Sequence, residues 1–188
     1  MASCGECAFA LSFRLATFEG SKMNRRNFLQ ATSLSLLAAG LSPRAFAARE
    51  KVRIGLIGTG MRGQVLLTEL VRRDDVDVLA LCDIEPIMLA RALAMIEKAG
   101  KRKPATFGDN ADTQAYKKLL AVKGLDAVII ATPWEWHAPM AIDAMEARVA
   151  VGCEVVAGIT LEDHWKVLRT QLRTGTPYML LENVCFRR

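Results

Sequence analysis

The chain has 188 residues, 52% of them hydrophobic, and a net charge of +5, which is enough apolar sequence for one well-packed core. Residues 1–47 have the pattern of a leader, which is described below. The remaining chain has 20 Lys and Arg against 18 Asp and Glu and no dense basic stripe. Nucleic-acid binding is therefore not expected. Three of the five cysteines lie in that remainder without close spacing, which argues against a disulfide framework.

Residues 23–47 have the three parts of an export signal. Arg25-Arg26 precede a short apolar run, and Ala45-Phe46-Ala47 has the small residues of a cleavage site. The run is shorter than the about 20 residues that span a bilayer, so we expect no stable membrane anchor. The arginine pair before Phe28-Leu29 resembles a twin-arginine signal, which predicts recognition by that export machinery and a periplasmic or secreted product. The alternative is an amphipathic helix with a chance arginine pair.

Residues 1–22 precede a second methionine, Met23, where such a signal would naturally start. Cys4 and Cys7 form a C-x-x-C, which is half of a common metal site. No second pair stands at ligand spacing, so we predict no metal site. We interpret this stretch as a mis-called start or a disordered extension.

From residue 48 onward, short apolar runs alternate with segments of helical periodicity. Strands are predicted at 51–58, 76–83, 105–107, 125–132, 149–153 and 178–183, and helices at 64–73, 86–99, 113–122, 139–148 and 161–172.

The predicted strands are apolar throughout, which is typical of a parallel sheet covered on both faces. Right-handed crossovers then favour a doubly wound, Rossmann-like α/β domain over residues 48–188, with strand order 3-2-1-4-5-6. Sheets of this kind bind ligands at the carboxyl ends of their strands. Polar residues at those ends are therefore the candidates for a site.

The turn after the first strand is a G-x-G-x-x-G, formed by Gly58, Thr59, Gly60, Met61, Arg62 and Gly63. Its position between a strand and a helix is the context in which this motif binds dinucleotides, because the backbone must turn tightly and approach a pyrophosphate. The N–H groups at the start of the following helix would face the phosphates. The alternative is an ordinary tight turn.

Asp83 ends the second strand, 20 residues after Gly63. A carboxylate at this place accepts hydrogen bonds from the adenosine ribose and repels a 2′-phosphate, so NAD is favoured over NADP. The alternative is that Asp83 caps the helix that starts at Pro86.

Polar side chains also follow the later strands. Thr132, Trp136 and His137 lie in and after the loop behind the fourth strand, where a tryptophan could stack on a cofactor or sugar ring. His137 either positions substrate or orients the following helix. Glu154 ends the fifth strand and Asn183 the sixth; Glu154 could also be an ordinary surface carboxylate.

At these residues the chain resembles the N-terminal half of the Gfo/Idh/MocA oxidoreductase family. The resemblance covers the whole chain after the leader and rests on "VRIGLIGTGMRG", Asp83, "VIIATPWEWH" and Glu154. In that family the fifth strand is commonly followed by Glu-Lys-Pro, with the lysine near the carbon that gives up hydride. Here the residues are Glu154-Val155-Val156, which puts an ordinary sugar-alcohol dehydrogenase in doubt.

A narrower resemblance explains this departure. "ATPWEWHAPMAIDAM", the Glu-Val pair and "LENVCFRR" are similar to glycoside hydrolase family 109, typified by NAD-dependent α-N-acetylgalactosaminidases. The resemblance implies transient oxidation at sugar C3, elimination of the aglycone, addition of water and re-reduction, an exception to two-carboxylate glycosidases. It implies catalytic residues in a C-terminal substrate domain outside this sequence and possible homo-oligomers of the full-length form. The implied cofactor contacts are Gly58, Gly60, Gly63, Asp83, Trp136, His137, Glu154 and Asn183.

Three functions follow from these observations. The first is the NAD-binding half of an exported glycosidase acting on a small-molecule glycoside. The second is an exported sugar or polyol oxidoreductase with net hydride transfer. The third is a chain that binds NAD without catalysing a reaction. We expect this chain alone to be inactive. An exported product with tightly held NAD also explains the signal, because a cofactor loaded in the cytoplasm needs a route for folded proteins.

Overall fold

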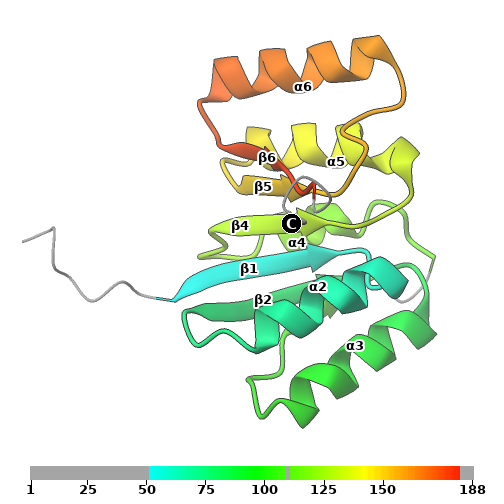
Figure 1. The fold of residues 1–188 in the computed structure, drawn as a ribbon, viewed down its shortest axis with the longest axis vertical. Helices are drawn as coiled ribbons and strands as arrows, with labels where there is room; N and C mark the ends of the chain where they lie inside the picture. The colour runs from blue at the N-terminus through cyan, green and yellow to red at the C-terminus, as the bar shows by residue number, and fades with distance from the viewer. Residues whose placement is uncertain (1–50, 109–110, 183–188) are drawn as a thin grey trace, which may run out of the picture. The chain divides into compact units, whose positions relative to one another are not determined.

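A computed structural model describes residues 51–108 and 111–182. They form a six-stranded parallel sheet with strand order β3-β2-β1-β4-β5-β6 (Figure 1). This order confirms the doubly wound arrangement expected from the sequence. The strands are β1 (Val52–Ile57), β2 (Val76–Cys82), β3 (Ala105–Phe107), β4 (Ala127–Ile130), β5 (Ala150–Cys153) and β6 (Tyr178–Leu180).

Helices cover the sheet from two sides. In Figure 1, α2 and α3 lie in front of the sheet and α4 behind it. The helix α2 packs on β1 and β2, whereas α5 packs on β4, β5 and α6. The helices are α2 (Met61–Val71), α3 (Pro86–Lys98), α4 (Tyr116–Leu120), α5 (Trp134–Glu146) and α6 (Leu161–Thr174).

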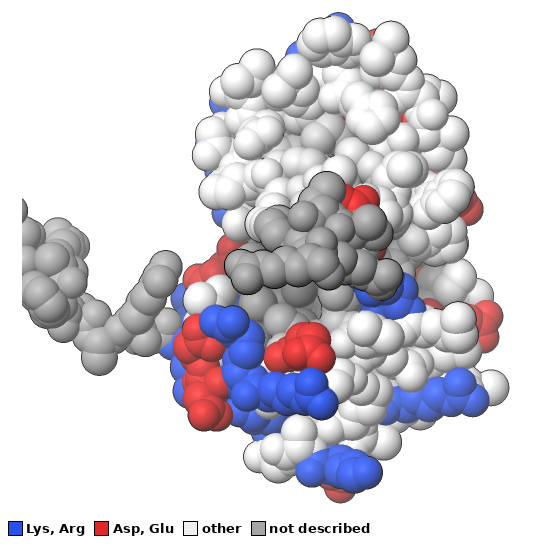
Figure 2. All heavy atoms as spheres, in the orientation of Figure 1, with Lys and Arg blue, Asp and Glu red and all other residues white. Residues whose placement is uncertain are grey.

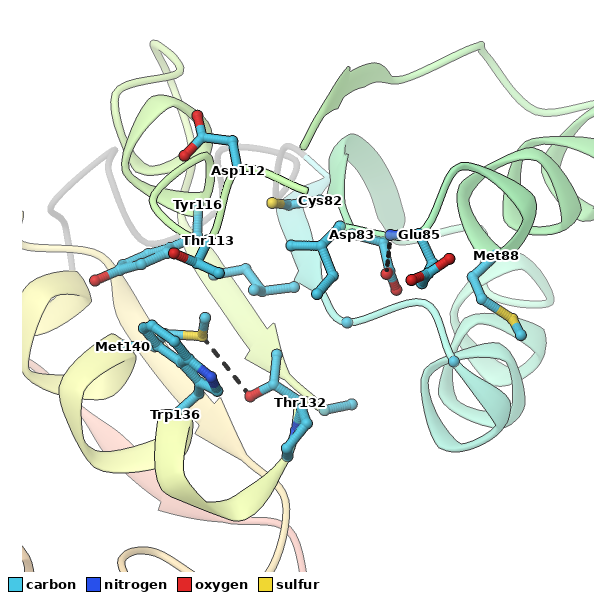
Figure 3. A pocket seen from close by; sticks show the side chains of 16 residues that line it. Cys82, Asp83, Glu85, Met88, Asp112, Thr113, Tyr116, Thr132, Trp136 and Met140 are labelled. Atoms are coloured by element: carbon cyan, nitrogen blue, oxygen red, sulfur yellow. Dashed lines mark hydrogen bonds between the residues drawn. The ribbon is translucent and has the colours of Figure 1, made fainter. Parts of the chain in front are cut away.

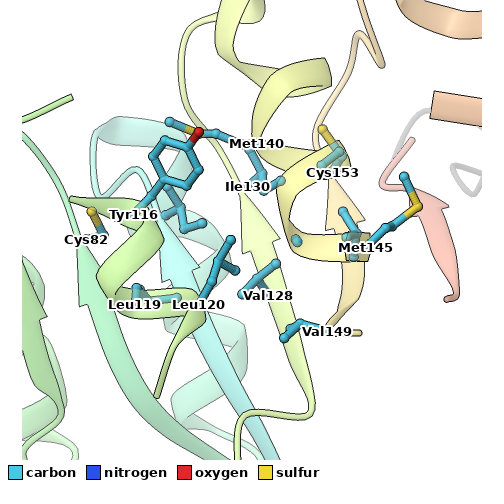
Figure 4. Close-up of a cluster of buried hydrophobic side chains, with 14 of the residues drawn as sticks. Cys82, Tyr116, Leu119, Leu120, Val128, Ile130, Met140, Met145, Val149 and Cys153 are labelled. Carbon is cyan, nitrogen blue, oxygen red and sulfur yellow. The ribbon is translucent and has the colours of Figure 1, made fainter. Parts of the chain in front are cut away.

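Two clusters of buried side chains correspond to the two layers. The larger joins α4 and α5 to the strands through residues such as Leu119, Ile130 and Met145, all almost fully buried (Figure 4). The smaller places Leu67 of α2 and Ile96 of α3 against the other side of the sheet. Because β1 and β2 contribute side chains to both clusters, their sequences are apolar at consecutive positions.

The helix α5 is where the expected elements differ most from the structure. We expected a helix at 139–148 with Pro139 at its start, but α5 begins at Trp134, directly after Pro133. A proline is favoured near the first turn, because its φ is already helical and its missing N–H has no partner there. Both prolines fit that description in sequence, and Pro133 fulfils it. Pro139 lies inside the helix, which lacks one backbone hydrogen bond there because proline has no N–H.

Candidate cofactor site

Each of the three glycines in the turn after β1 is required for a different structural reason. Gly58 has a φ of +89°, and a Cβ there would lie 2.5 Å from the carbonyl oxygen of Ala131. A Cβ on Gly63 would collide with the backbone carbonyl of Gly58, so α2 can pack this close to β1 only with glycine. A Cβ on Gly60 would meet nothing within 4 Å. The middle glycine therefore opens onto free space, where a dinucleotide-binding turn brings its backbone to the pyrophosphate.

The first turn of α2 presents backbone donors beside this opening. No side chain caps the helix at Gly60, and its first turn holds no acidic residue. The first N–H groups of a helix have no partner within the helix. Together with the helix dipole they favour an anion, so this end of α2 suits a phosphate.

Asp83 follows β2 and ties the turn to the neighbouring strand. Its Oδ2 accepts hydrogen bonds from the backbone N–H of Thr59 at 2.5 Å and from the Thr59 hydroxyl at 2.9 Å. Its Oδ1 accepts from the backbone N–H of Glu85 at 2.9 Å. The alternative of a cap before Pro86 is wrong, because Glu85 is the N-cap residue of α3 and no side chain caps this helix. The bond to Glu85 orders only the backbone directly before α3. A carboxylate has about four acceptor sites, so capacity remains for a ribose hydroxyl.

A cavity of about 280 Å³ opens between the carboxyl ends of β1, β2 and β4 (Figure 3). Gly58, Gly60, Asp83, Thr132 and Trp136, all predicted as site residues, line it. Its walls are otherwise mainly apolar, as expected for a pocket that takes the flat ring of a nucleotide base. Further lining residues are Ile57, Cys82, Ile84, Glu85, Met88, Asp112, Thr113, Tyr116, Ala131, Pro133 and Met140.

The wall contributed by α4 and by the segment before it was not predicted from the sequence. Asp112 and Thr113 follow β3. They could have been predicted as site residues, because such sheets bind ligands at the carboxyl ends of their strands. Tyr116 and Met140 had no such signal, because both belong to helices and read as core residues. Tyr116 is buried and donates to Asp143 at 2.6 Å. Burial is the main cause that raises the pKa of this phenol, followed by its hydrogen bond to Asp143.

His137 lies away from the cavity and holds two loops together. Its side chain is 1% exposed. Nδ1 lies 2.6 Å from the carbonyl oxygen of Val156, after β5, and Nε2 lies 2.8 Å from that of Thr132, after β4. A neutral imidazole has one N–H, so the tautomer decides which of the two carbonyls accepts its hydrogen bond. Of the two roles considered, this placement favours a positioning role in the protein over direct contact with substrate.

Glu154 is buried at the end of β5 and paired with the glycine-rich turn. Its exposed fraction is 6%, so the alternative of an ordinary surface carboxylate is wrong. Arg62 donates from Nε to Oε1 of Glu154 at 2.7 Å, and Nη2 of Arg62 lies 2.7 Å from the same oxygen. This charged pair spans from α2 to β5 and fixes the guanidinium near the start of α2. Met61, next to it, is 86% exposed and lies outside the cavity lining.

Two candidates remain without a structural account. Asn183 and the residues of the export signal lie outside the described residues.

Within the described ranges, no group of His, Cys, Asp and Glu could hold a metal ion. Burial raises the pKa of Cys82 and of Cys153 to about 12, so both thiols stay protonated at neutral pH. In the same part of the chain, no helix is long and apolar enough to cross a membrane.

The glycine-rich turn, the uncapped start of α2, Asp83 and the apolar cavity together define a dinucleotide-binding Rossmann domain. The family model "Oxidoreductase family, NAD-binding Rossmann fold" matches residues 52–180. The chain therefore belongs to the Gfo/Idh/MocA family, whose cofactor is NAD.

Curated relatives are named as glycoside hydrolases. A "Glycosyl hydrolase family 109 protein" of Stenotrophomonas maltophilia is 68% identical over 168 residues, which are 88% of this chain and 37% of the relative. An "Alpha-N-acetylgalactosaminidase" of Shewanella oneidensis is 34% identical over 188 residues, covering 88% of this chain and 40% of that protein. This chain thus spans about two fifths of the length of these relatives.

Solved structures show the same fold. A scyllo-inositol dehydrogenase from Lactobacillus casei with bound NAD(H) and scyllo-inositol has a TM-score of 0.59 at 20% identity, covering 70% of this chain and 36% of that one. An NAD-binding protein from Listeria innocua has a TM-score of 0.58 at 26% identity, covering 72% and 36%.

Proposed function

We propose that this chain is the cofactor-binding half of an exported NAD-dependent glycosidase that acts on α-N-acetylgalactosaminides. The observation that carries the proposal is the 68% identity to a family 109 glycoside hydrolase over most of the chain. The site supports it, because the residues that hold a dinucleotide are present and in register.

The residues of the chain bind and orient the cofactor. The glycine-rich turn and the first turn of α2 would receive the pyrophosphate, and Asp83 would accept from the ribose of the adenosine half. Thr132 and Trp136 form the wall on the side of β4. Bound NAD supplies a reversible hydride acceptor, so that a sugar oxidised at C3 loses its aglycone, takes up water and is reduced again without net redox change.

The end of β5 favours a glycosidase over a dehydrogenase with net hydride transfer. Val155 stands where Gfo/Idh/MocA enzymes commonly have the lysine of Glu-Lys-Pro. The cation nearest to Glu154 in the described residues is Arg62, and it is held by that carboxylate. A guanidinium stays protonated, so Arg62 does not replace this lysine as a proton acceptor. The Glu-Val pair itself is the feature similar to glycoside hydrolase family 109.

The test is an assay of the product of this locus, including any reading frame that continues beyond codon 188. We expect release of the phenol from an aryl α-N-acetylgalactosaminide with bound NAD and no accumulation of NADH. The 188-residue chain alone is expected to bind NAD without turnover. NADH formation from a free sugar or polyol would identify the alternative oxidoreductase. A product of the locus, of whatever length, that binds NAD but catalyses neither reaction would support the third function, NAD binding without catalysis.

Export by the twin-arginine route is part of the proposal. A tightly held dinucleotide is available in the cytoplasm, and a route for folded proteins would carry it across with the domain. Replacing Arg25 and Arg26 by lysine should retain the folded chain in the cytoplasm, as measured by fractionation and immunoblotting. A chain that reaches the periplasm at the wild-type level despite this double substitution would refute the twin-arginine route.

A further inference from the structure

The helix α6 carries its large apolar side chains on the side that faces solvent. Leu161, Trp165, Leu168 and Leu172 are 74%, 46%, 42% and 76% exposed. Their spacing of four, three and four residues places them in one row along the helix. We call this row the α6 stripe. In the view of Figure 2, charged side chains gather around α2 and α3, and the region where Figure 1 places α6 shows mostly uncharged atoms.

The opposite side of the same helix packs on the domain with smaller and more polar residues. The buried residues of α6 are Val167, Thr170 and Thr174. At about 100° per residue, the centre of the α6 stripe lies roughly 150° around the axis from this buried side. The most apolar side of α6 therefore does not pack against this domain. An exposed apolar row of this size marks an interaction surface.

The charges that flank the α6 stripe are unevenly distributed along the helix. Glu162 lies on one flank near the N-terminal end, and Arg169 lies on the same flank two turns later. They approach within 3.5 Å of each other across the surface of the helix. Both are largely exposed, so this pair contributes little to stability and is free to exchange partners.

We propose that α6 is a self-association surface, on which two copies of this chain pair antiparallel through their α6 stripes. The spacing of four, three and four is the same in both directions, so a two-fold axis between Trp165 and Leu168 sets Leu161 opposite Leu172 of the other copy. The same axis brings Glu162 close to Arg169 of the other copy. A parallel two-fold pairing would set this flank against the opposite flank of the other copy, where His164 and Gln171 lie, and would form no such pair of opposite charges. The occupant of the α6 stripe is thus a second copy.

The size of the surface determines the strength of the association. A 14-residue helix is about 21 Å long, and four side chains cover less than the ~800 Å² per partner of a typical stable interface. The dimer should therefore be in exchange with the monomer at micromolar concentrations. None of the α6 stripe residues lines the cofactor cavity, so dimer formation and NAD binding can be measured separately.

The test is sedimentation equilibrium of the full chain over a range of concentrations. We expect a monomer–dimer equilibrium that Leu168→Glu weakens by at least about tenfold, since it buries an unpaired charge at the centre of the contact. Ile87→Glu on α3, the same kind of change at a side chain that is 63% exposed, is the control and should not alter association. NAD binding and the melting temperature report that each variant is folded.

Charge reversal tests the antiparallel arrangement. Glu162→Arg and Arg169→Glu should each weaken the dimer, and the double variant should restore it, because the exchanged charges meet again across the two-fold axis. A chain that stays monomeric at all concentrations overturns the proposal, as does a dimer that Leu168→Glu leaves unchanged. A double variant weaker than both single variants overturns the antiparallel pairing.

Discussion

At the scale of single residues, Asp83 combines a structural task with the ribose contact that we propose for the same carboxylate. It accepts from the N–H and hydroxyl of Thr59 and from the N–H of Glu85. The position of Asp83 and the preference for NAD followed from the sequence, because the strand, the turn and the spacing were readable. The bonds to Thr59 did not, because they join segments 24 residues apart.

Replacing Asp83 by asparagine should weaken NAD binding by roughly tenfold or more, since a charge-assisted hydrogen bond to the ribose contributes about 1.5–3 kcal/mol. Isothermal titration calorimetry measures this. Asp77→Asn, at the other end of β2, is the matched control and should bind NAD as the wild type does. Equal affinity of the Asp83 variant and the control would show that Asp83 does not contact the cofactor.

The glycines of the turn separate folding from binding. Gly63→Ala should lower stability by about 1–3 kcal/mol, because its Cβ would collide with the rigid backbone of Gly58. Gly60→Ala has space for its Cβ and a φ of −64°, so its melting temperature should stay near that of the wild type while NAD affinity falls. Thermal unfolding and titration of both variants check this. A Gly60 variant with unchanged affinity would place the pyrophosphate elsewhere.

At the scale of elements, predictability depended on whether a signal had one interpretation. The strand order could be predicted from alternation and handedness alone. The start of α5 could not, because Pro133 and Pro139 both suit a helix start. The buried side of α6 was also beyond the sequence, since its leucines and Trp165 suggest a core-facing row, whereas the domain buries Thr170 and Thr174 instead.

The loops after β4 and β5 should depend on His137. His137→Leu removes the imidazole that contacts the carbonyl oxygens of Thr132 and Val156, and the loss of a partly buried hydrogen bond of this kind costs about 1–3 kcal/mol. We expect a clear fall in the melting temperature and weaker NAD binding. His164→Leu, at an exposed position on α6, is the control and should melt as the wild type does. A His137 variant as stable as this control would mean that the two carbonyls find other donors.

At the scale of the whole domain, several carboxylates lose their favourable partners in acid. Hydrogen bonds from the side chain and then the backbone of Arg53 lower the pKa of Asp126, and the pKa values of Asp112, Glu146 and Asp163 are lowered as well. Because the folded pKa lies below the unfolded value of about 4, their contribution is complete above about pH 4 and is lost as the pH falls through the folded pKa.

The melting temperature should therefore be nearly constant from about pH 7 to about pH 5 and fall towards about pH 3. Asp126→Asn should lower stability at neutral pH and make the acid-induced fall shallower. Calorimetric scans at the three pH values measure both effects. An equally steep fall in the variant would assign the acid sensitivity to other groups.

The hydrogen bonds from Thr59 to Asp83 have a consequence for redesigning coenzyme preference. Exchanging this residue for a small or basic one is the obvious way to admit the 2′-phosphate of NADP. In this chain the exchange would also release the backbone at Thr59, next to Gly60, and so disturb the pyrophosphate cradle that both coenzymes share. A successful conversion therefore needs a second substitution that supplies a new acceptor for Thr59.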